Sequence, residues 1–379
     1  ERALVAAGRP SAPVPPNLAG PLRDTDSLGG LREVHAAGDE LDVPGPARLL
    51  HLPQLFVDDS VEFVSHRKHP FQSRVLQRSL ESARQRDLHW SLNETGNPAL
   101  LIGYDADERC ADSMPYFKGI ATGEDRQRHL IVIALQDSAM RDAFLKVCID
   151  IISVLQNVPK GQQRHAVIIR LERWAYFFRG KKAKLTEEEQ KGLIAELVCL
   201  QRVTLKMLEP KAALRSWVGP QRAVHDFVFG QTSIEVKSNR GAGTPNITIS
   251  SSSQLSVNDD EALFLYVVEV NQASSPNEGR TLADYVRHTR ESFDSPLDAL
   301  EFDLKLSQVG YSETDDYSST LWSVGSIRCF TVSQDFPHIE EDSLNPAISC
   351  VTYKVNLNCC NPFEIGEEQI RNSLRGNDA

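Results

Sequence analysis

The chain has 379 residues, of which 41% are hydrophobic, and a formal net charge of −11. It contains no apolar run near the roughly 20 residues that cross a bilayer, and its first residues lack the charged-then-apolar pattern of a secretory signal. Its seven cysteines are scattered and include no CxxC pair, which argues against a disulfide framework or a structural zinc site. We therefore expect a cytoplasmic protein with reduced thiols, no membrane partner and two or three domains.

The amino-terminal part predicts an arm followed by an accessory domain. Residues 1–46 are rich in Pro, Gly and Ala without periodicity, as in an extended or disordered segment. Residues 47–158 combine strand-like runs at 98–104 and 129–135 with a helical run at 139–155, which indicates an α+β accessory domain. This part lacks a P-loop, a GxSxG elbow and HExxH spacing, so it carries no recognisable catalytic set.

A capping box formed by Thr186 and Glu189 predicts the start of a helix that continues to about Leu208. Glu196 lies within the leucine-rich stripe of this helix and should therefore face the core. A buried acid needs a partner. Two interpretations stay open: a salt bridge to a buried arginine, or a contribution to a metal cluster, directly or through water.

A β-hairpin is predicted around Gly230-Gln231. Apolar runs flank this pair, and a two-residue loop that begins with Gly is typical of a type II′ turn. Such a turn places Asp226 directly opposite Glu235, with Cβ atoms about 5 Å apart. Lys237 shares a face with Glu235, because side chains alternate along a strand. Two carboxylates and a lysine therefore converge.

The chemistry of this convergence points to a metal. Facing carboxylates repel one another unless a cation or a proton lies between them. Mg²⁺ prefers hard oxygen ligands and commonly takes one or two protein carboxylates together with phosphate oxygens. A neighbouring lysine suits the negative charge that develops on a phosphodiester in its transition state. The pattern indicates a phosphodiester-cleaving site; the alternative is an ordinary ladder of charges on a solvated strand.

The tripeptide acid-x-Lys alone has little meaning, because it occurs four times, ending at Lys191, Lys211, Lys237 and Lys305. Only the occurrence that ends at Lys237 lies in an apolar strand pattern with a second acid opposite it. The others lie in helix-like or proline-interrupted contexts, where this spacing does not place both side chains on one face. Context therefore selects one of the four.

The order of these features resembles the core of the PD-(D/E)xK nuclease superfamily. An acid lies on a long helix, a short strand is expected near 214–217, Asp226 lies on the next strand, and Glu235-Val236-Lys237 lies on the third. More narrowly, the chain resembles the PD-(D/E)xK motif proteins of bacterial restriction-like operons, which typically also encode a DNA cytosine methyltransferase, a Morc-like ATPase, a helicase-like ATPase and an AIPR protein. The segments that carry this resemblance are 191–197, 217–220, 225–227 and 234–238.

The resemblance implies roles for individual residues. Asp226 and Glu235 become ligands of Mg²⁺, for which Mn²⁺ should substitute, and the carbonyl of Val236 becomes a third ligand. Lys237 becomes the group that orients water and stabilises the transition state. Glu196 matches the helical acid, which in such proteins often assists metal binding.

Two neighbouring residues are interpreted with less help from the motif. His225 stands where the motif has proline, and it alternates to the face of Phe227, so we interpret it as a packed residue rather than a ligand. Gln254 lies where related nucleases sometimes place a glutamine near the site. A simple helix cap is the alternative for Gln254.

The fold expected from the resemblance is α/β, with a restriction-endonuclease-like αβββαβ core at 159–275 that closes with a strand at 263–270. A C-terminal α/β extension follows at 276–379. Within it we expect helices at 281–293 and 296–306 and strands at 321–332 and 351–357.

Charge is distributed unevenly along the chain. Residues 160–240 hold 16 Lys and Arg against 8 Asp and Glu, a balance of +8 that leaves −19 for the remainder. The basic stretch contains the expected site and suits phosphate binding, whereas the acidic remainder suits solvation or a basic partner. For any single basic cluster, a solvated face is the alternative.

Two functions from different classes follow. The favoured one is a Mg²⁺-dependent DNA endonuclease or nickase that serves as the nuclease subunit of a restriction-like anti-phage defence system, with ATPase or helicase and methyltransferase partners. The alternative is a catalytically silent DNA-binding or assembly subunit that keeps the fold. Because the chain has no P-loop, we expect weak or silent activity without partners. The oligomeric state, including a homodimer, stays open.

Overall fold

The computed structural model describes residues 88–92, 96–108, 113–180, 184–241, 245–257, 260–340, 344–345, 347–348 and 350–375. All of them belong to one compact unit. The arm expected at 1–46 and the beginning of the accessory domain lie outside the described residues. The domain boundaries at 46, 158 and 275 stay predictions.

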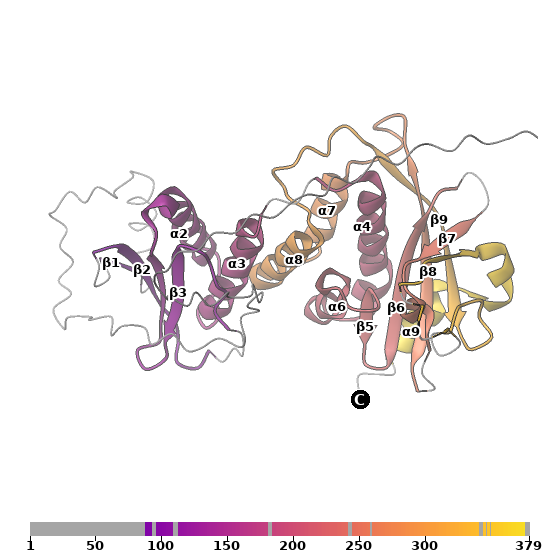
Figure 1. The fold of residues 1–379 in the computed structure, drawn as a ribbon, viewed down its shortest axis with the longest axis horizontal. Helices are drawn as coiled ribbons and strands as arrows, with labels where there is room; N and C mark the ends of the chain where they lie inside the picture. The colour runs from indigo at the N-terminus through magenta and orange to yellow at the C-terminus, as the bar shows by residue number, and fades with distance from the viewer. Residues whose placement is uncertain are drawn as a thin grey trace, which may run out of the picture. The chain divides into compact units, whose positions relative to one another are not determined.

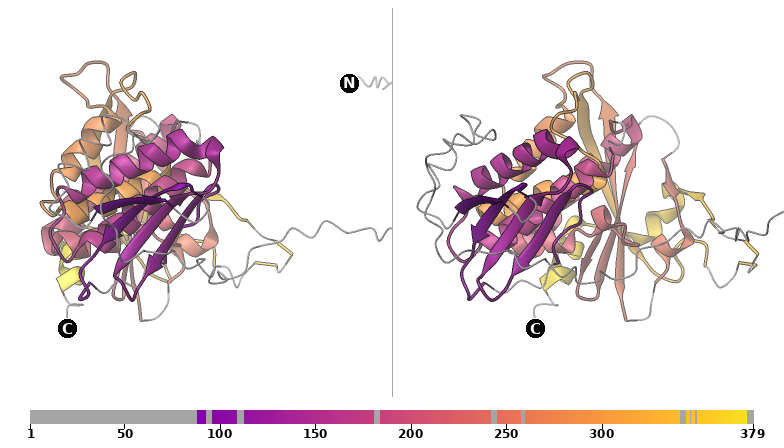
Figure 2. Two further views of the ribbon diagram at one scale, coloured as in Figure 1. Left: turned by 90° about the vertical axis from the view of Figure 1, so that its left-hand side faces the viewer. Right: turned by 60° about the vertical axis from the view of Figure 1, so that its left-hand side comes forward.

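An antiparallel sheet and two helices form the first layers of the described chain. The sheet has the strand order β1-β2-β4-β3, and α2 and α3 cover one of its faces (Figures 1 and 2). Strand alternation explains this packing, because Ile131 and Ile133 contact the helices while Val132 points to the opposite face. The elements are β1 (Leu88–Leu92), β2 (Pro98–Gly103), β3 (Ile120–Asp125), β4 (Leu130–Leu135), η1 (Ser138–Met140), α2 (Arg141–Leu155) and α3 (Gln163–Phe178). The strands expected at 98–104 and 129–135 and the helix expected at 139–155 are confirmed.

A mixed five-stranded sheet forms the second core, in the order β11-β9-β8-β6-β5. Strands β6 and β8 are parallel, and the other neighbours are antiparallel. Both faces of β8 are buried, since Phe264 and Tyr266 pack in one hydrophobic cluster and Leu263 and Leu265 in another. The strands are β5 (Phe227–Phe229), β6 (Thr232–Asn239), β8 (Ala262–Gln272), β9 (Trp322–Val332) and β11 (Glu364–Ile365), with β7 (Asn246–Ile249) and β10 (Tyr353–Asn356) paired separately.

Helices pack around this sheet, and α4 lies against β6 and β8 (Figure 1). The capping box at Thr186 starts α4 as expected, and the helix continues through a π-helical turn, η2, into α5. Helix α3 packs against α8 as well as against the first sheet. The elements are α4 (Glu187–Cys199), η2 (Leu200–Thr204), α5 (Leu205–Met207), α6 (Pro210–Ser216), η3 (Gly219–Gln221), η4 (Ser252–Leu255), α7 (Leu282–Arg290), α8 (Pro296–Val309), η6 (Leu357–Phe363) and α9 (Glu367–Arg375).

The expected strand near 214–217 is wrong. Helix α6 occupies this stretch, and only Trp217 makes an isolated bridge, to Phe227. Pro210 begins the helix at its first turn, where proline fits, and Ala212 and Ala213 follow as strong helix formers.

The expected αβββαβ order also needs correction between the parallel strands β6 and β8. The described part of that connection consists of β7 and the 3₁₀ turn η4 rather than an α-helix. The run of serines at 250–253 explains the turn, because serine side chains bond the nearby backbone in non-helical conformations. The fold is thus mixed α/β, and the connection between its parallel strands differs from the expected one.

The later elements agree with the expectations. Strand β8 covers the strand expected at 263–270. Helix α7 lies within the helix expected at 281–293, and α8 covers the one expected at 296–306. Strands β9 and β10 match those expected at 321–332 and 351–357. Strand β9 pairs with β8, so the chain after residue 276 contributes to the central sheet. In the described part of the chain, no helix is both long enough and apolar enough to span a bilayer.

Candidate active site

The hairpin forms with the expected register. Strand β5 pairs antiparallel with β6, with Phe229 opposite Thr232, so that only Gly230 and Gln231 form the loop. Gly230 has a φ of 56°, and Gln231 is not among the described residues with positive φ, which fits a type II′ turn. The predicted turn and register are confirmed.

Asp226 immediately precedes β5 and, by this register, lies opposite Glu235. Its backbone carbonyl accepts hydrogen bonds from the N–H groups of Val218 (2.8 Å) and Gly219 (2.9 Å). Its carboxylate Oδ2 accepts a third from the backbone N–H of Val236, at 2.8 Å. The carboxylate is therefore held in place, with Oδ2 directed to the strand backbone.

Glu235 is buried in β6, with only 1% of its surface exposed. Its neighbours Ile234 and Val236 pack in the core cluster beneath α4, as the alternation predicts. Its Oε1 accepts a hydrogen bond from the ammonium of Lys237, and its Oε2 is buried without a partner among the described residues. The alternative of a charge ladder on a solvated strand does not hold, because this acid is not solvated.

Glu196 is half-buried on α4 and accepts a hydrogen bond on Oε2 from Nε1 of Trp217, at 2.7 Å. The structure shows no ion pair between Glu196 and an arginine within the described ranges. The partner of this acid is thus the indole of Trp217, which follows α6 and forms an isolated bridge with Phe227 of β5.

Gly219 brings two of the carboxylates to one point. A Cβ atom on this glycine would lie 2.8 Å from Oδ1 of Asp226 and 3.3 Å from Oε2 of Glu196. The two oxygens therefore lie within 3.3 Å of the same position, which only a residue without a side chain leaves open. Sequence reasoning missed this residue, although it lies in a segment that carries the family resemblance.

The carboxyl groups of this cluster have raised pKa values. Burial, followed by the charge of Asp226, raises the pKa of Glu235 to about 8. Burial also raises the pKa of Asp226, against the hydrogen bond from Val236 and the charge of Lys237. Burial and then the charge of Asp226 raise the pKa of Glu196 well above its ordinary value. The three acids thus share one electrostatic environment that disfavours full ionisation without a cation.

Lys237 and Gln254 are in contact. The ammonium of Lys237 donates to Oε1 of Gln254 at 3.2 Å, in addition to Glu235. The same oxygen of Gln254 accepts from the backbone N–H of Ser250 at 2.9 Å. Gln254 therefore both closes its own loop and reaches the lysine, so the two interpretations offered for it are not exclusive.

His225 is half-buried beside the backbone of Gln254. Burial lowers its pKa, so the ring is neutral at neutral pH. Its Nε2 is buried without a partner among the described residues. The ring packs beside η4 at the edge of the site.

Lys305 supports the site from α8 and was missed in the sequence. Its Nζ, on a side chain that is 7% exposed, donates to the carbonyl of Trp217 at 2.5 Å. Burial lowers the pKa of Lys305 to about 8. On the same helix, Asp303 accepts two hydrogen bonds from Arg290, both at 2.9 Å, and lies 3.6 Å from Arg173. The acid and the lysine at 303–305 thus stabilise the surrounding structure. Sequence reasoning could not find the contact between Lys305 and Trp217, because the two residues lie 88 positions apart and no local pattern connects them.

The carboxylates are oxygen donors of the type that a divalent cation prefers. Among the described residues, no group of three or more His, Cys, Asp and Glu side chains is arranged to hold a metal. Mg²⁺ commonly takes only one or two protein carboxylates, however, and completes its shell with water and substrate oxygens. The buried Oε2 of Glu235, which lacks a partner, is a donor of the type this cation prefers. Metal ligation by Asp226, Glu235, Val236 and Glu196 stays a prediction.

The mixed sheet, the acidic hairpin and the acid on the adjacent helix together define a protein consistent with the PD-(D/E)xK class. A family model described as "Putative PD-(D/E)XK family member, (DUF4420)" matches residues 59–358. The chain belongs to this family. No curated protein and no solved structure matches it. The resemblance seen in the sequence is therefore confirmed at the level of the family.

Proposed function

We propose that this chain is a Mg²⁺-dependent DNA endonuclease or nickase that accepts Mn²⁺. We further propose that it serves as the nuclease subunit of a bacterial restriction-like anti-phage defence system. The observation that carries the proposal is the buried Glu235, which has an oxygen without a partner beside Lys237 and opposite Asp226, in a chain of the PD-(D/E)XK family. A buried acid with a raised pKa in such a cluster is typical of a functional site.

The residues divide the work as follows. Asp226 and Glu235 would hold the metal, with the carbonyl of Val236 as a further ligand. When bound, a divalent cation supplies Lewis-acid stabilisation to the phosphate and makes water nucleophilic at neutral pH. Lys237 is held in place by Glu235 and Gln254, and its charge would stabilise the phosphate in the transition state.

Glu196 would assist from the helix side. Its contact with Trp217 fixes the carboxylate, and Gly219 keeps the space between this acid and Asp226 open. The proposed role is to position the metal through water, since one of its oxygens is already bonded to the indole.

Partner subunits would control the activity. The balance of −19 outside residues 160–240 repels phosphates and weakens DNA binding by the single chain. A basic partner could dock on the same acidic remainder. We propose that ATPase or helicase and methyltransferase subunits supply DNA engagement and control, as in the operons that the chain resembles.

Plasmid cleavage tests the proposal. Purified wild type, Asp226→Ala, Glu235→Ala and Lys237→Ala are incubated with supercoiled plasmid at low salt with Mg²⁺ or Mn²⁺, and with EDTA as the metal-free control. Lys211→Ala is the matched lysine control, because Lys211 is exposed and belongs to another acid-x-Lys sequence. We expect each of the three site variants to abolish metal-dependent cleavage and the control to keep it.

The outcomes separate the two classes of function. Cleavage at the wild-type rate by any site variant would contradict the residue assignment. A wild type that binds DNA but cuts none, alone or with its partners, would favour the silent DNA-binding subunit.

A further inference from the structure

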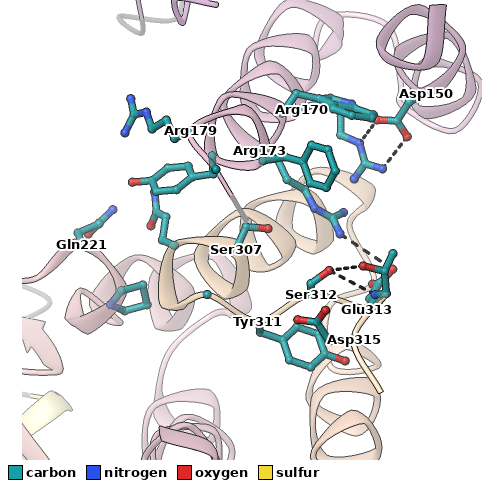
Figure 3. A pocket seen from close by; sticks show the side chains of 18 of the residues that line it. Asp150, Arg170, Arg173, Arg179, Gln221, Ser307, Tyr311, Ser312, Glu313 and Asp315 are labelled. Carbon is teal, nitrogen blue, oxygen red and sulfur yellow. Dashed lines mark hydrogen bonds and ion pairs between the residues drawn. The ribbon is translucent and has the colours of Figure 1, made fainter. Parts of the chain in front are cut away.

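A pocket of about 740 Å³ lies beside the candidate site and is not used by the proposed chemistry (Figure 3). It is enclosed by the C-terminal half of α3, the end of α8 with the loop that follows, and the 3₁₀ turn η3. Gly219 starts η3 and faces the carboxylates, whereas the next three residues of the chain line the pocket. The pocket and the site therefore share one turn of the chain.

Two arginines of the pocket have no carboxylate partner in the described part of the chain. Arg179 and Arg222 line the pocket, both are exposed, and neither has an ion-pair partner within the described ranges. The guanidinium of Arg179 lies 5.1 Å from the ring centroid of Tyr176, and Arg222 adopts a left-handed backbone with φ 62°. Guanidinium groups without a carboxylate partner suit a phosphate, which they bind in a bidentate manner.

The wall along α3 is aromatic and held in place. Asp150 accepts a hydrogen bond from Nε1 of Trp174 at 2.7 Å and two from Arg170, both at 2.6 Å. Phe177 packs edge-on to Trp174, with centroids 5.5 Å apart, yet remains 57% exposed. An exposed ring beside a fixed indole offers a stacking surface for a planar base.

Away from Arg179 and Gln221 in Figure 3, the pocket holds charges of both signs. Arg170 and Arg173 lie there with Asp150, Glu313 and Asp315, and Arg173 lies 4.0 Å from Glu313. Gln308 also lines the pocket, and its Oε1 is buried without a partner among the described residues. Carboxylate and amide oxygens accept hydrogen bonds from the N–H groups on the edge of a base.

We propose that this pocket binds a nucleotide, with its phosphate at Arg179 and Arg222, its base against Phe177, and an N–H group of the base donating to Oε1 of Gln308. The guanidinium groups without an ion-pair partner suit the phosphate, the exposed ring of Phe177 suits the base, and the buried Oε1 of Gln308 suits an N–H donor of a guanine base. The nucleotide has two sources: a free mononucleotide, or a nucleotide of the strand that enters the site. The second source rests on the proposed nuclease function, and the first does not.

Calorimetric titration in EDTA tests the pocket, in an Asp226→Asn background that leaves DNA uncut. The probes are guanosine monophosphate and a short single-stranded oligonucleotide containing guanine. Variants Arg179→Ala, Phe177→Ala and Arg222→Gly are compared with the parent, and glycine at 222 accepts the left-handed backbone. Arg128→Ala is the control, because Arg128 is an exposed arginine on the distant β3–β4 turn.

We expect each pocket variant to weaken binding of at least one probe roughly tenfold and the control to leave it unchanged. Binding of the mononucleotide identifies a free nucleotide as ligand, and binding of the oligonucleotide alone identifies a strand nucleotide. No binding of either probe, or binding that all three pocket variants keep, overturns the proposal. Because the titration needs neither metal nor cleavage, its failure is distinct from failure of the nuclease proposal.

Discussion

Replacing Gly219 by alanine should damage the site without a large loss of stability. The new Cβ would lie 2.8 Å from Oδ1 of Asp226, about 0.6 Å inside the 3.4 Å at which ordinary contact begins. It would also lie 3.3 Å from the Cα of Asp226, so the carboxylate cannot retreat freely. Either this carboxylate or the turn that carries residue 219 must move by roughly half an ångström, which is the tolerance of a preorganised site.

The chain offers a matched control in Gly192. This glycine lies in α4, and a Cβ there would meet nothing within 4 Å. Both substitutions are Gly→Ala and reduce the freedom of the unfolded chain equally. Gly192→Ala should therefore raise the free energy of unfolding by about 1 kcal/mol. Gly219→Ala should raise the free energy of unfolding by less than this, or lower it.

The assay is thermal unfolding with and without Mn²⁺, together with plasmid cleavage. We expect Gly219→Ala to bind metal about tenfold more weakly, which removes about 1.4 kcal/mol of metal-dependent stabilisation. Cleavage should fall about tenfold to a hundredfold, and Gly192→Ala should match the wild type in both measurements. If Gly219→Ala shows wild-type stabilisation by Mn²⁺ and wild-type cleavage, the site does not depend on the space that Gly219 leaves open beside Asp226 and Glu196.

The remaining predictions concern charge. In the absence of metal, Asp226→Ala should unfold at or above the wild-type temperature, because it removes repulsion from Glu235; unfolding far below wild type would show that the acid is structural. Glu235 holds its proton more tightly in the folded protein, where its pKa is about 8 against an ordinary 4.5. The free energy of unfolding without metal should therefore fall as pH rises from about 5 to 8. Denaturant titrations of Glu235→Gln should show a smaller fall. Lys305 should give the opposite pH dependence, because its pKa is lowered from 10.5 to about 8 and the folded state binds the proton less tightly. The free energy of unfolding should therefore rise between about pH 8 and 10.5. The variant Lys305→Met should lack this rise. DNA binding by the single chain should weaken steeply with salt in fluorescence anisotropy, and salt-tolerant binding would contradict a dependence on partners.

The sequence predicted the hairpin well because its determinants are local. A two-residue loop with Gly230 first leaves one register, and alternation then assigns faces to Glu235 and Lys237. The start of α4 was equally accessible, since the capping box at Thr186 satisfies its own backbone donors.

The remaining features depend on contacts between distant segments. The composition of 214–217 is compatible with a strand or a helix. The chain forms α6 here because Pro210 favours the first turn of a helix. The partner of Glu196 proved to be Trp217, whereas periodicity alone leaves open a salt bridge to a buried arginine or a contribution to a metal cluster. Lys305 meets Trp217 across 88 residues, and the pocket joins α3, η3 and α8, so neither follows from a local pattern.

Metal-dependent cleavage by wild type and Lys237→Ala tests the central claim most directly. The measurement follows conversion of supercoiled plasmid to nicked or linear DNA at low salt, with Mn²⁺ or with EDTA. For the wild type we expect slow conversion that needs the metal, falls with salt, and rises when partner subunits are added; Lys237→Ala should show none. Cleavage that persists in EDTA or in Lys237→Ala would contradict the account, as would no cleavage by the wild type even with its partners present.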